Sequence, residues 1–339
     1  MTETKVTSLD VARVAGVSQS AVSRVFTPGA SVSKGMEAKV KKAAESLGYR
    51  PNSLARAMIT GKSRIIGLVV AYLDNQFYPV ALERLSHALQ ERGYHILIFM
   101  AGNTHEAVAK VVDDLLAYQV DGIITASVDM SGSLAAQCSA AGIPVVLFNR
   151  GQPGAGLSSV TSANLEGGAK VARFLAQGPH ERIAHIAGWQ GSSTGFDRTQ
   201  GFLTGLRAQE RPEPTVIDGM YDRETAAQAT RSLMEGSAPP DAIFVGNDHM
   251  AFAVMDMLKT MGLSVPGDVS IVGYDDVPMA SWAAYDLTTV RQPVNRMIEA
   301  TVETLLSQLN DPDRHIQKIE IDGPLILRGS ARLAKDAPS

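Results

Sequence analysis

The stretch TSLDVARVAGVSQSAVSRV, residues 7–25, decides the fold of the N-terminal region. A hydroxyl at Thr7 and a carboxylate three residues later at Asp10 form a capping-box pattern, which predicts a helix beginning near Ser8. Ala12 is small enough for close helix packing, and Gly16 gives the backbone freedom that a tight turn needs. The spacing therefore predicts a helix-turn-helix.

The second helix of this motif is predicted to begin after Ser18, whose hydroxyl can cap it. Val22 and Val25 lie three residues apart and point into a small core. The outward face of the helix then carries Gln19, Ser20, Ser23 and Arg24. A recognition helix offers such positions to base edges and phosphates. An ordinary surface hairpin with polar residues outside would show the same pattern, so the following residues have to decide.

A third helix is predicted to begin after Ser33 and to end at Gly48. Its apolar stripe consists of Val40, Ala43, Ala44 and Leu47. The next stretch, YRPNSLARAM at residues 49–58, has Pro51 where a helix could start but is too short to be stable alone. We expect it to order only when it docks against something.

Net charge also separates the predicted N-terminal helical region from the rest of the chain. Residues 1–64 contain eleven Lys and Arg against four Asp and Glu, a net charge of +7, whereas the whole chain has a formal net charge of −4. The remainder therefore carries −11. A basic head on an acidic body is the electrostatic pattern of a phosphate-binding module.

Length and composition limit the number of domains and the class of protein. The 339 residues suit two or three domains, and the 45% hydrophobic content is sufficient for a sizeable core. We expect a soluble protein of the cytoplasm, because there is no long apolar run, no signal-peptide pattern and only one cysteine. That cysteine, Cys138, is expected to pack in the core.

From residue 65 onward, short apolar runs alternate with helical segments. Strands are predicted at 65–70, 96–99, 122–125, 145–148, 183–187, 242–245 and 270–272, and helices at 80–92, 106–117, 134–141, 165–176, 198–208 and 250–261. This alternation is typical of parallel sheets with helical crossovers. The count fits an α/β core of two doubly wound parallel-sheet lobes, in which ligands lie beyond the carboxyl ends of the strands.

The chain resembles the lac repressor family of bacterial transcription regulators along essentially all 339 residues, from Val6-Thr7 through Gly48-Tyr49 and Pro51-Asn52 to the motifs of the core. The resemblance implies a small all-α DNA-binding head and a core like that of periplasmic binding proteins of type I. The expected domains are a helix-turn-helix at 1–50, a hinge helix and linker at 51–63, and an effector-binding and dimerisation core at 64–339. Lobe one is expected at about 64–161 and 291–324, and lobe two at about 162–290 and 325–339.

The resemblance also implies how such a head binds double-stranded operator DNA as a homodimer. Base edges would be read by Gln19, Ser20 and Arg24, and phosphates held by Thr7, Ser18, Ser23 and Asn52. Ala55 and Met58 would lie in the minor groove. Two departures stand out: Met58 replaces the usual wedge leucine, and Met36-Glu37 replaces a phosphate-binding Thr-Arg pair. No leucine heptads follow Gly329, so a dimer is the default.

For the core, the resemblance implies an effector site at strand ends. The candidate positions are Phe77, Tyr78, Asn149, Arg150, Trp189, Arg198, Tyr221, Asp248 and Gln292, and the resemblance implies that Arg198 is the strongest contact. Phe77 and Tyr78 could instead staple the next helix, and Trp189 and Tyr221 could be plain core residues. Asp248 could bind ligand hydroxyls, cap the following helix, or do both. Asn149 replaces the family's usual acid beside Arg150, which favours an anionic effector such as a sugar acid or sugar phosphate.

These patterns predict a repressor of carbohydrate or sugar-acid catabolism genes that releases its operator when a small effector binds. The alternatives are a corepressor-dependent repressor of the purine-regulator type and, from another class, a sugar-binding transport protein. An enzyme is disfavoured, because no Gly-x-Gly-x-x-Gly follows the first strand and the seven histidines show no metal-ligand spacing. We therefore expect no catalytic residue, no metal and no cofactor beyond the effector.

Overall fold

The structure is a computed structural model that describes residues 6–27, 30–50, 62–102, 105–128, 130–311 and 315–333. The chain forms two compact units, Met1–Ser63 and Arg64–Ser339, and each is described by itself.

The first unit contains three helices, α1 (Ser8–Ala15), α2 (Gln19–Val25) and α3 (Lys34–Ser46). The predicted capping box is confirmed, because Thr7 accepts a hydrogen bond from the Asp10 amide and Asp10 accepts one from the Thr7 amide. Ser18 and Ser33 cap α2 and α3 as predicted. A small apolar core joins the three helices and consists of Val11, Ala12, Val22, Val40, Ala43 and Ala44.

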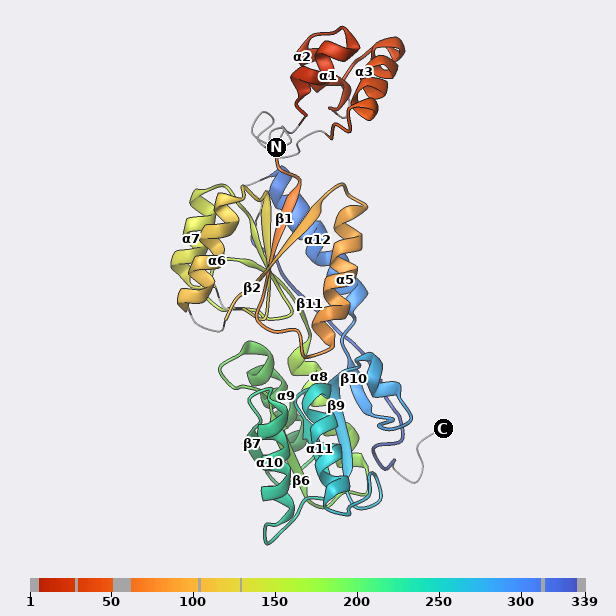
Figure 1. The fold of residues 1–339 in the computed structure, drawn as a ribbon. Coiled ribbons are helices and arrows are strands. Elements are labelled where there is room, and N and C mark those ends of the chain that lie inside the picture. The colour runs from red at the N-terminus through yellow and green to blue at the C-terminus, as the bar shows by residue number, and fades with distance from the viewer. Residues whose placement is uncertain are drawn as a thin grey trace. The chain divides into compact units, whose positions relative to one another are not determined.

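The second unit is built on two sheets, each at the centre of one lobe (Figure 1). The sheet of the first lobe has the order β11-β5-β4-β3-β1-β2, and all of its neighbouring strands are parallel. Its strands are β1 (Ile65–Val70), β2 (His95–Met100), β3 (Gly122–Ala126), β4 (Val145–Phe148), β5 (Ser158–Ser162) and β11 (Lys318–Ile321).

The sheet of the second lobe has the order β12-β10-β9-β8-β6-β7. It is parallel except for its short edge strand β12, which runs antiparallel to β10. Its strands are β6 (Ile183–Ala187), β7 (Thr215–Asp218), β8 (Ala242–Val245), β9 (Ser270–Asp275), β10 (Thr288–Arg291) and β12 (Leu325–Ile326). The predicted doubly wound α/β core is thus confirmed. The chain passes between the lobes after β5, after β10 and after β11.

Helices cover both faces of each sheet, as Figure 1 shows. In the first lobe, α5 (Phe77–Gln90) packs beside α12 (Val294–Asn310), and α6 (His105–Ala117) packs beside α7 (Gly132–Ala140). In the second lobe, α8 (Asn164–Gln177) pairs with α9 (Ser193–Ala208), and α10 (Arg223–Met234) pairs with α11 (Asp248–Thr260). A short 3-10 helix, η1 (Pro278–Ser281), follows β9.

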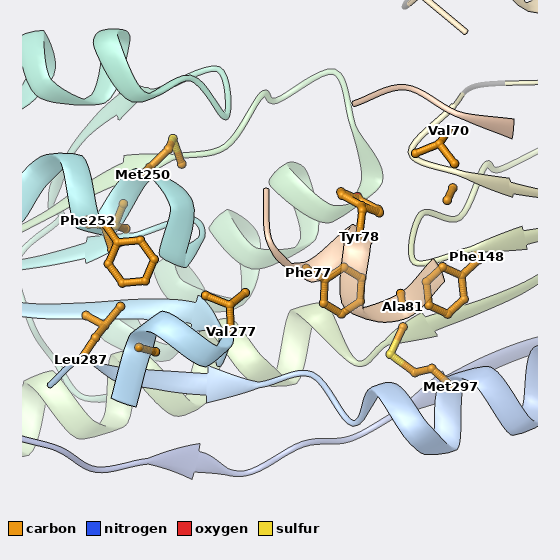
Figure 2. Close-up of a cluster of buried hydrophobic side chains, with 14 of the residues drawn as sticks. Val70, Phe77, Tyr78, Ala81, Phe148, Met250, Phe252, Val277, Leu287 and Met297 are labelled. Carbon is orange, nitrogen blue, oxygen red and sulfur yellow. The ribbon is translucent and has the colours of Figure 1, made fainter. Parts of the chain in front are cut away.

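One apolar cluster runs through both lobes. Figure 2 shows Phe77 and Phe148 of the first lobe in the same cluster as Met250 and Val277 of the second. The rings of Phe77 and Phe148 are stacked, with centroids 6.1 Å apart. Apolar packing therefore continues across the junction that positions the strand ends of the two lobes against each other.

The structure adds elements that the sequence patterns did not predict. These are β5, β7, β10, β11, β12, α10 and α12. Several predicted helices also begin earlier than expected; α9 begins at Ser193 rather than at residue 198. The expected bounds of the lobes, 64–161 with 291–324 and 162–290 with 325–339, remain predictions.

Candidate functional site

A cavity of about 470 Å³ lies where strand ends of the two lobes meet. Its lining residues are Tyr72, Asp74, Asn75, Arg150, Trp189, Met220, Tyr221 and His249. They follow the carboxyl ends of β1 and β4 in the first sheet and of β6, β7 and β8 in the second. This is where ligands bind in open α/β sheets.

Aromatic side chains form much of this lining. Tyr221 follows β7 and, like Met220 before it, has a positive φ, which turns its ring back over Gly188. A Cβ at Gly188 would lie 2.1 Å from the Tyr221 ring, so only glycine fits there. The Tyr221 hydroxyl donates to Thr194 at 3.1 Å. Tyr221 and Trp189 therefore both line this cavity.

Arg150 is the buried cation of the cavity. Its guanidinium lies 5.8 Å from the centre of the Trp189 ring and donates to the Ser127 carbonyl at 3.3 Å. It also donates to the Tyr72 hydroxyl at 3.5 Å. The residue is only 7% exposed. A largely buried cation beside an aromatic ring is well placed to bind an anionic or polar ligand group.

Two of the predicted residues, Tyr78 and Asn149, lie behind the residues that line the cavity. The Tyr78 hydroxyl shares a hydrogen bond with Ser127 and accepts one from the Asn149 amide at 3.0 Å. Burial raises the pKa of Tyr78 well above its usual value, so the phenol stays neutral. Asn149 has a positive φ and turns the chain at the end of β4 toward Arg150. Tyr78 and Asn149 support the cavity wall but do not line it.

Phe77 and Gln292 line a different cavity. It has a volume of about 330 Å³ and includes residues of α5, of the segment 275–281 and of the start of α12. Gln292 donates to Asp275 at 2.7 Å. Phe77 is the first residue of α5, and its buried ring stacks on Phe148 of β4.

Arg198 is buried in a polar cluster and does not line the 470 Å³ cavity. Its guanidinium donates to the Asn164 side chain at 2.9 Å and to the Gly246 carbonyl at 2.7 Å. It also pairs with Asp275 at 3.3 Å and lies 3.6 Å from the centre of the Tyr274 ring. Each nitrogen of the guanidinium thus has a protein partner, and the group also lies over the Tyr274 ring.

Asp275 is a member of this cluster that the sequence analysis missed. Its carboxylate accepts from Arg198, from Gln292 and from Asn75, the last at 3.4 Å. Asn75 belongs to the first lobe and lines the cavity, so Asp275 connects the two lobes beneath it. The signal in the sequence was a pair of acids, Asp275 and Asp276, directly at a strand end.

The predicted capping role of Asp248 is wrong. Asn247 is the N-cap of α11 and accepts from the Met250 amide at 2.9 Å. Asp248 is the first residue of the helix, and its buried carboxylate accepts from Thr289 at 2.6 Å and from the Val277 amide at 3.0 Å. By sequence, either Asn247 or Asp248 could cap the helix. Asn247 is the cap, because its backbone is extended.

Burial raises the pKa of Asp248 to about 7, and the charge of Asp275 adds to this. We expect the stability contributed by this carboxyl to be greatest near pH 4 and to fall as the pH rises toward 7, because the folded protein holds the proton that the unfolded chain releases. The variant Asp248→Asn should lose this slope, because an amide does not titrate, and its side-chain oxygen can still accept the hydrogen bond from Thr289. Urea unfolding of both proteins between pH 4.5 and 8 measures it. Parallel slopes for the two proteins would contradict the prediction.

The helix-turn-helix places its predicted DNA-contacting residues on the surface. Ser20, Ser23 and Arg24 are exposed on α2, and Gln19 donates to the Ser8 hydroxyl of α1 at 2.9 Å. This contact fixes the direction of the Gln19 side chain. Two hydroxyls already serve as caps, at Thr7 and Ser18. The predicted hinge residues Asn52, Ala55 and Met58 lie outside the described residues.

The described residues also bear on metal binding and on membrane insertion. Within the described ranges, no group of three or more His, Cys, Asp or Glu side chains is arranged to hold a metal ion. None of the described helices is long and apolar enough to cross a membrane.

Two family models match this chain. Residues 7–52 match the bacterial regulatory proteins of the lacI family, and residues 171–331 match a periplasmic binding protein-like domain. The chain belongs to the lacI family. It is therefore a DNA-binding transcription regulator that responds to a ligand, as the sequence analysis predicted.

Full-length relatives agree with this assignment. The chain is 28% identical to the HTH-type transcriptional repressor PurR of Vibrio atlanticus over 326 residues, covering 95% of this chain and 98% of the relative. It is 29% identical to the probable HTH-type transcriptional repressor ExuR of Bacillus subtilis over 340 residues, with 96% and 98% covered.

Solved structures share the fold of this lacI-family member. A lac repressor dimer bound to operator and the anti-inducer ONPF has a TM-score of 0.86 at 26% identity, covering 96% of this chain and 99% of that one. A complex of the transcriptional regulator CelR with cellobiose has a TM-score of 0.71 at 29% identity, covering 96% and 100%.

Proposed function

We propose that this regulator is a homodimeric repressor that releases a pseudopalindromic operator when a carbohydrate or sugar acid binds in the 470 Å³ cavity. The observation that carries the proposal is the lining itself, in which Tyr72, Trp189 and Tyr221 surround Arg150. Aromatic faces suit the apolar faces of sugar rings, and an arginine suits a carboxylate or phosphate. The related CelR structure holds cellobiose, which supports a carbohydrate in this fold.

The dimer and the operator belong to the same proposal. The similar lac repressor was solved as a dimer on its operator. On this basis Gln19, Ser20 and Arg24 would read base edges in two half-sites, and the hinge segments of both copies would lie near each other at the centre. Such a repressor acts where the operator is, so we place it in the cytoplasm.

The proposed switch follows from the two lobes. Because residues on both sheets line the cavity, a ligand that contacts both favours one relative arrangement of the lobes. A change in that arrangement alters the spacing of the two DNA-binding heads in a dimer, and hence the affinity for operator DNA.

The test is a thermal-shift screen followed by operator titration. The panel contains D-glucose, D-glucuronate, glucose 6-phosphate and hypoxanthine, since a ligand of the native state raises the melting temperature. The operator duplex is recovered by selection from randomised DNA. A sugar or sugar acid that raises the melting temperature and weakens operator binding supports the proposal. If only a non-carbohydrate binds, the proposed effector class is wrong.

A corepressor is the second candidate, favoured by the similarity to PurR. The three aromatic rings that suit a sugar also suit a flat heterocycle. The sign of the operator titration separates the two candidates: a ligand that strengthens operator binding indicates corepression.

Arg150 gives a prediction on ligand charge. The variant Arg150→Met should lose about 10- to 100-fold in affinity for an anionic sugar, since a hydrogen bond to a charged group contributes about 1.5–3 kcal/mol. Affinity for the matching neutral sugar should change much less. Isothermal titration with D-glucuronate and D-glucose measures both. Equal losses for the two ligands would show that Arg150 acts only on the shape of the cavity.

A further inference from the structure

One contact at the rim of the cavity joins the two lobes through charged groups. The His249 Nε2 of α11, in the second lobe, lies 3.6 Å from the Asp74 Oδ2 in the loop after β1, in the first lobe. The His249 side chain is 13% exposed and that of Asp74 is 70% exposed. The other oxygen of Asp74 accepts from the Asn75 amide at 3.1 Å, which orients the carboxylate.

The distance decides how this pair acts. At 3.6 Å it is too long for a hydrogen bond, so its strength depends on whether the imidazole carries a charge. A neutral imidazole has little attraction for the carboxylate, whereas an imidazolium attracts it directly. The attraction between the two side chains is therefore smaller at high pH than at low pH.

The surroundings of His249 set that charge. Burial lowers the pKa of His249 below its usual value, and the carboxylate of Asp74 acts in the opposite direction. Arg223 of α10 lowers this pKa further, and its guanidinium donates to the His249 carbonyl at 3.1 Å, while Asp222 raises it. Arg150 lies in the same cavity lining, and the N-terminus of α11 also disfavours a cation. His249 is thus mostly neutral at pH 7 and gains its proton at a lower pH than an ordinary histidine.

We propose that His249 and Asp74 form a gate at the rim of the cavity: protonation of His249 draws Asp74 toward it, holds the two lobes together over the effector and raises effector affinity as the pH falls. The gate rests on the proposed function, because it takes the cavity to be the effector site. His249 and Asp74 act as positioning residues.

The first experiment needs no effector. Imidazole NMR signals of the full-length protein are followed from pH 8 to pH 5, and His249 is assigned by its loss in His249→Gln. In Asp74→Asn, His249 should titrate at lower pH than in the wild type, because the carboxylate that favours the imidazolium is gone. Asp114→Asn, on the exposed face of α6 in the same lobe, is the matched control and should leave the titration unchanged. An unchanged His249 titration in Asp74→Asn overturns the gate.

The second experiment tests whether the cavity wall moves when His249 is protonated. The chain has two tryptophans, so Trp282→Phe leaves Trp189, in the cavity, as the only one. Its fluorescence emission should shift along the His249 titration, and Asp74→Asn should abolish the shift. An emission that does not follow the titration shows that the pair forms without moving the cavity wall, which also overturns the gate.

The third experiment adds a probe. D-glucuronate stays ionised over this range, and its affinity should rise by up to about fivefold from pH 8 to pH 5.5, the effect of an exposed ion pair. His249→Gln should remove the rise, whereas His95→Gln, on exposed strand β2, should keep it. A rise that survives His249→Gln overturns the gate. If D-glucuronate binds at no pH, it is not an effector of this protein, and the NMR and fluorescence results decide the gate.

Discussion

Replacing Arg198 by methionine should lower the free energy of unfolding of the core by about 3–5 kcal/mol, because it leaves the carboxylate of Asp275 buried without its cation. Arg198 and Asp275 are 3% and 4% exposed, so water cannot substitute for the lost charge. The remaining partners of Asp275 are the amides of Gln292 and Asn75. The melting temperature should fall by on the order of 10 °C. Urea unfolding and calorimetry of the purified proteins measure the loss.

Two further variants make this test specific. Arg207 also pairs with a carboxylate, that of Glu213, but both side chains are more than half exposed. Arg207→Met should therefore cost no more than about 1 kcal/mol. The double variant Arg198→Met with Asp275→Asn removes both charges and should recover part of the stability. A loss for Arg198→Met as small as that for Arg207→Met would show that the buried pair contributes nothing beyond an exposed one.

The sequence predicted those parts of the fold that depend on local rules. The caps at Thr7, Ser18 and Ser33 follow from side-chain chemistry within three residues, and the buried strands β1, β4 and β8 are continuous apolar runs. Such signals need no knowledge of the rest of the chain.

The sequence did not predict the polar strands, because their burial depends on tertiary contacts. β5 reads Ser-Ser-Val-Thr-Ser and yet is fully buried. The Ser158 hydroxyl accepts from the Gln308 side chain of α12 and from the Gln317 amide, both more than a hundred residues away. Buried hydroxyls are tolerated because they are hydrogen-bonded, and partners so distant in sequence are invisible to a local pattern.

The candidate site was likewise predicted only in part. The sequence named Arg150, Trp189 and Tyr221 as candidates for the effector site, and the structure places all three in the lining of one cavity. It did not separate lining residues from the layer behind them: Tyr78 and Arg198 are buried and fully engaged with protein groups. Which side of a strand end faces a cavity depends on how the two lobes pack, and this information lies in contacts between distant segments.

Replacing Arg24 by alanine should reduce operator affinity by about 30-fold to 10⁴-fold. A base-reading arginine contributes about 1–3 kcal/mol, and a dimer on two half-sites loses it twice. Arg24 is exposed on α2, so the helix-turn-helix should keep its stability. Fluorescence anisotropy with the selected operator and with an unrelated duplex measures specific and non-specific binding, and the ratio between them should fall.

The control for Arg24 is a basic residue on the other helix of the motif. Arg13 lies on α1, is exposed, and pairs with Asp10 at 3.3 Å. Arg13→Ala removes the same charge from the head without touching the predicted recognition face, so it should leave the ratio of specific to non-specific affinity unchanged. If Arg24→Ala instead weakens both duplexes equally and reduces the salt dependence by the same amount, Arg24 contacts phosphates and base reading falls to Gln19 and Ser20. A change in the ratio for Arg24 alone supports a contact of the guanidinium with a base edge, since phosphate contacts by themselves do not distinguish one sequence from another.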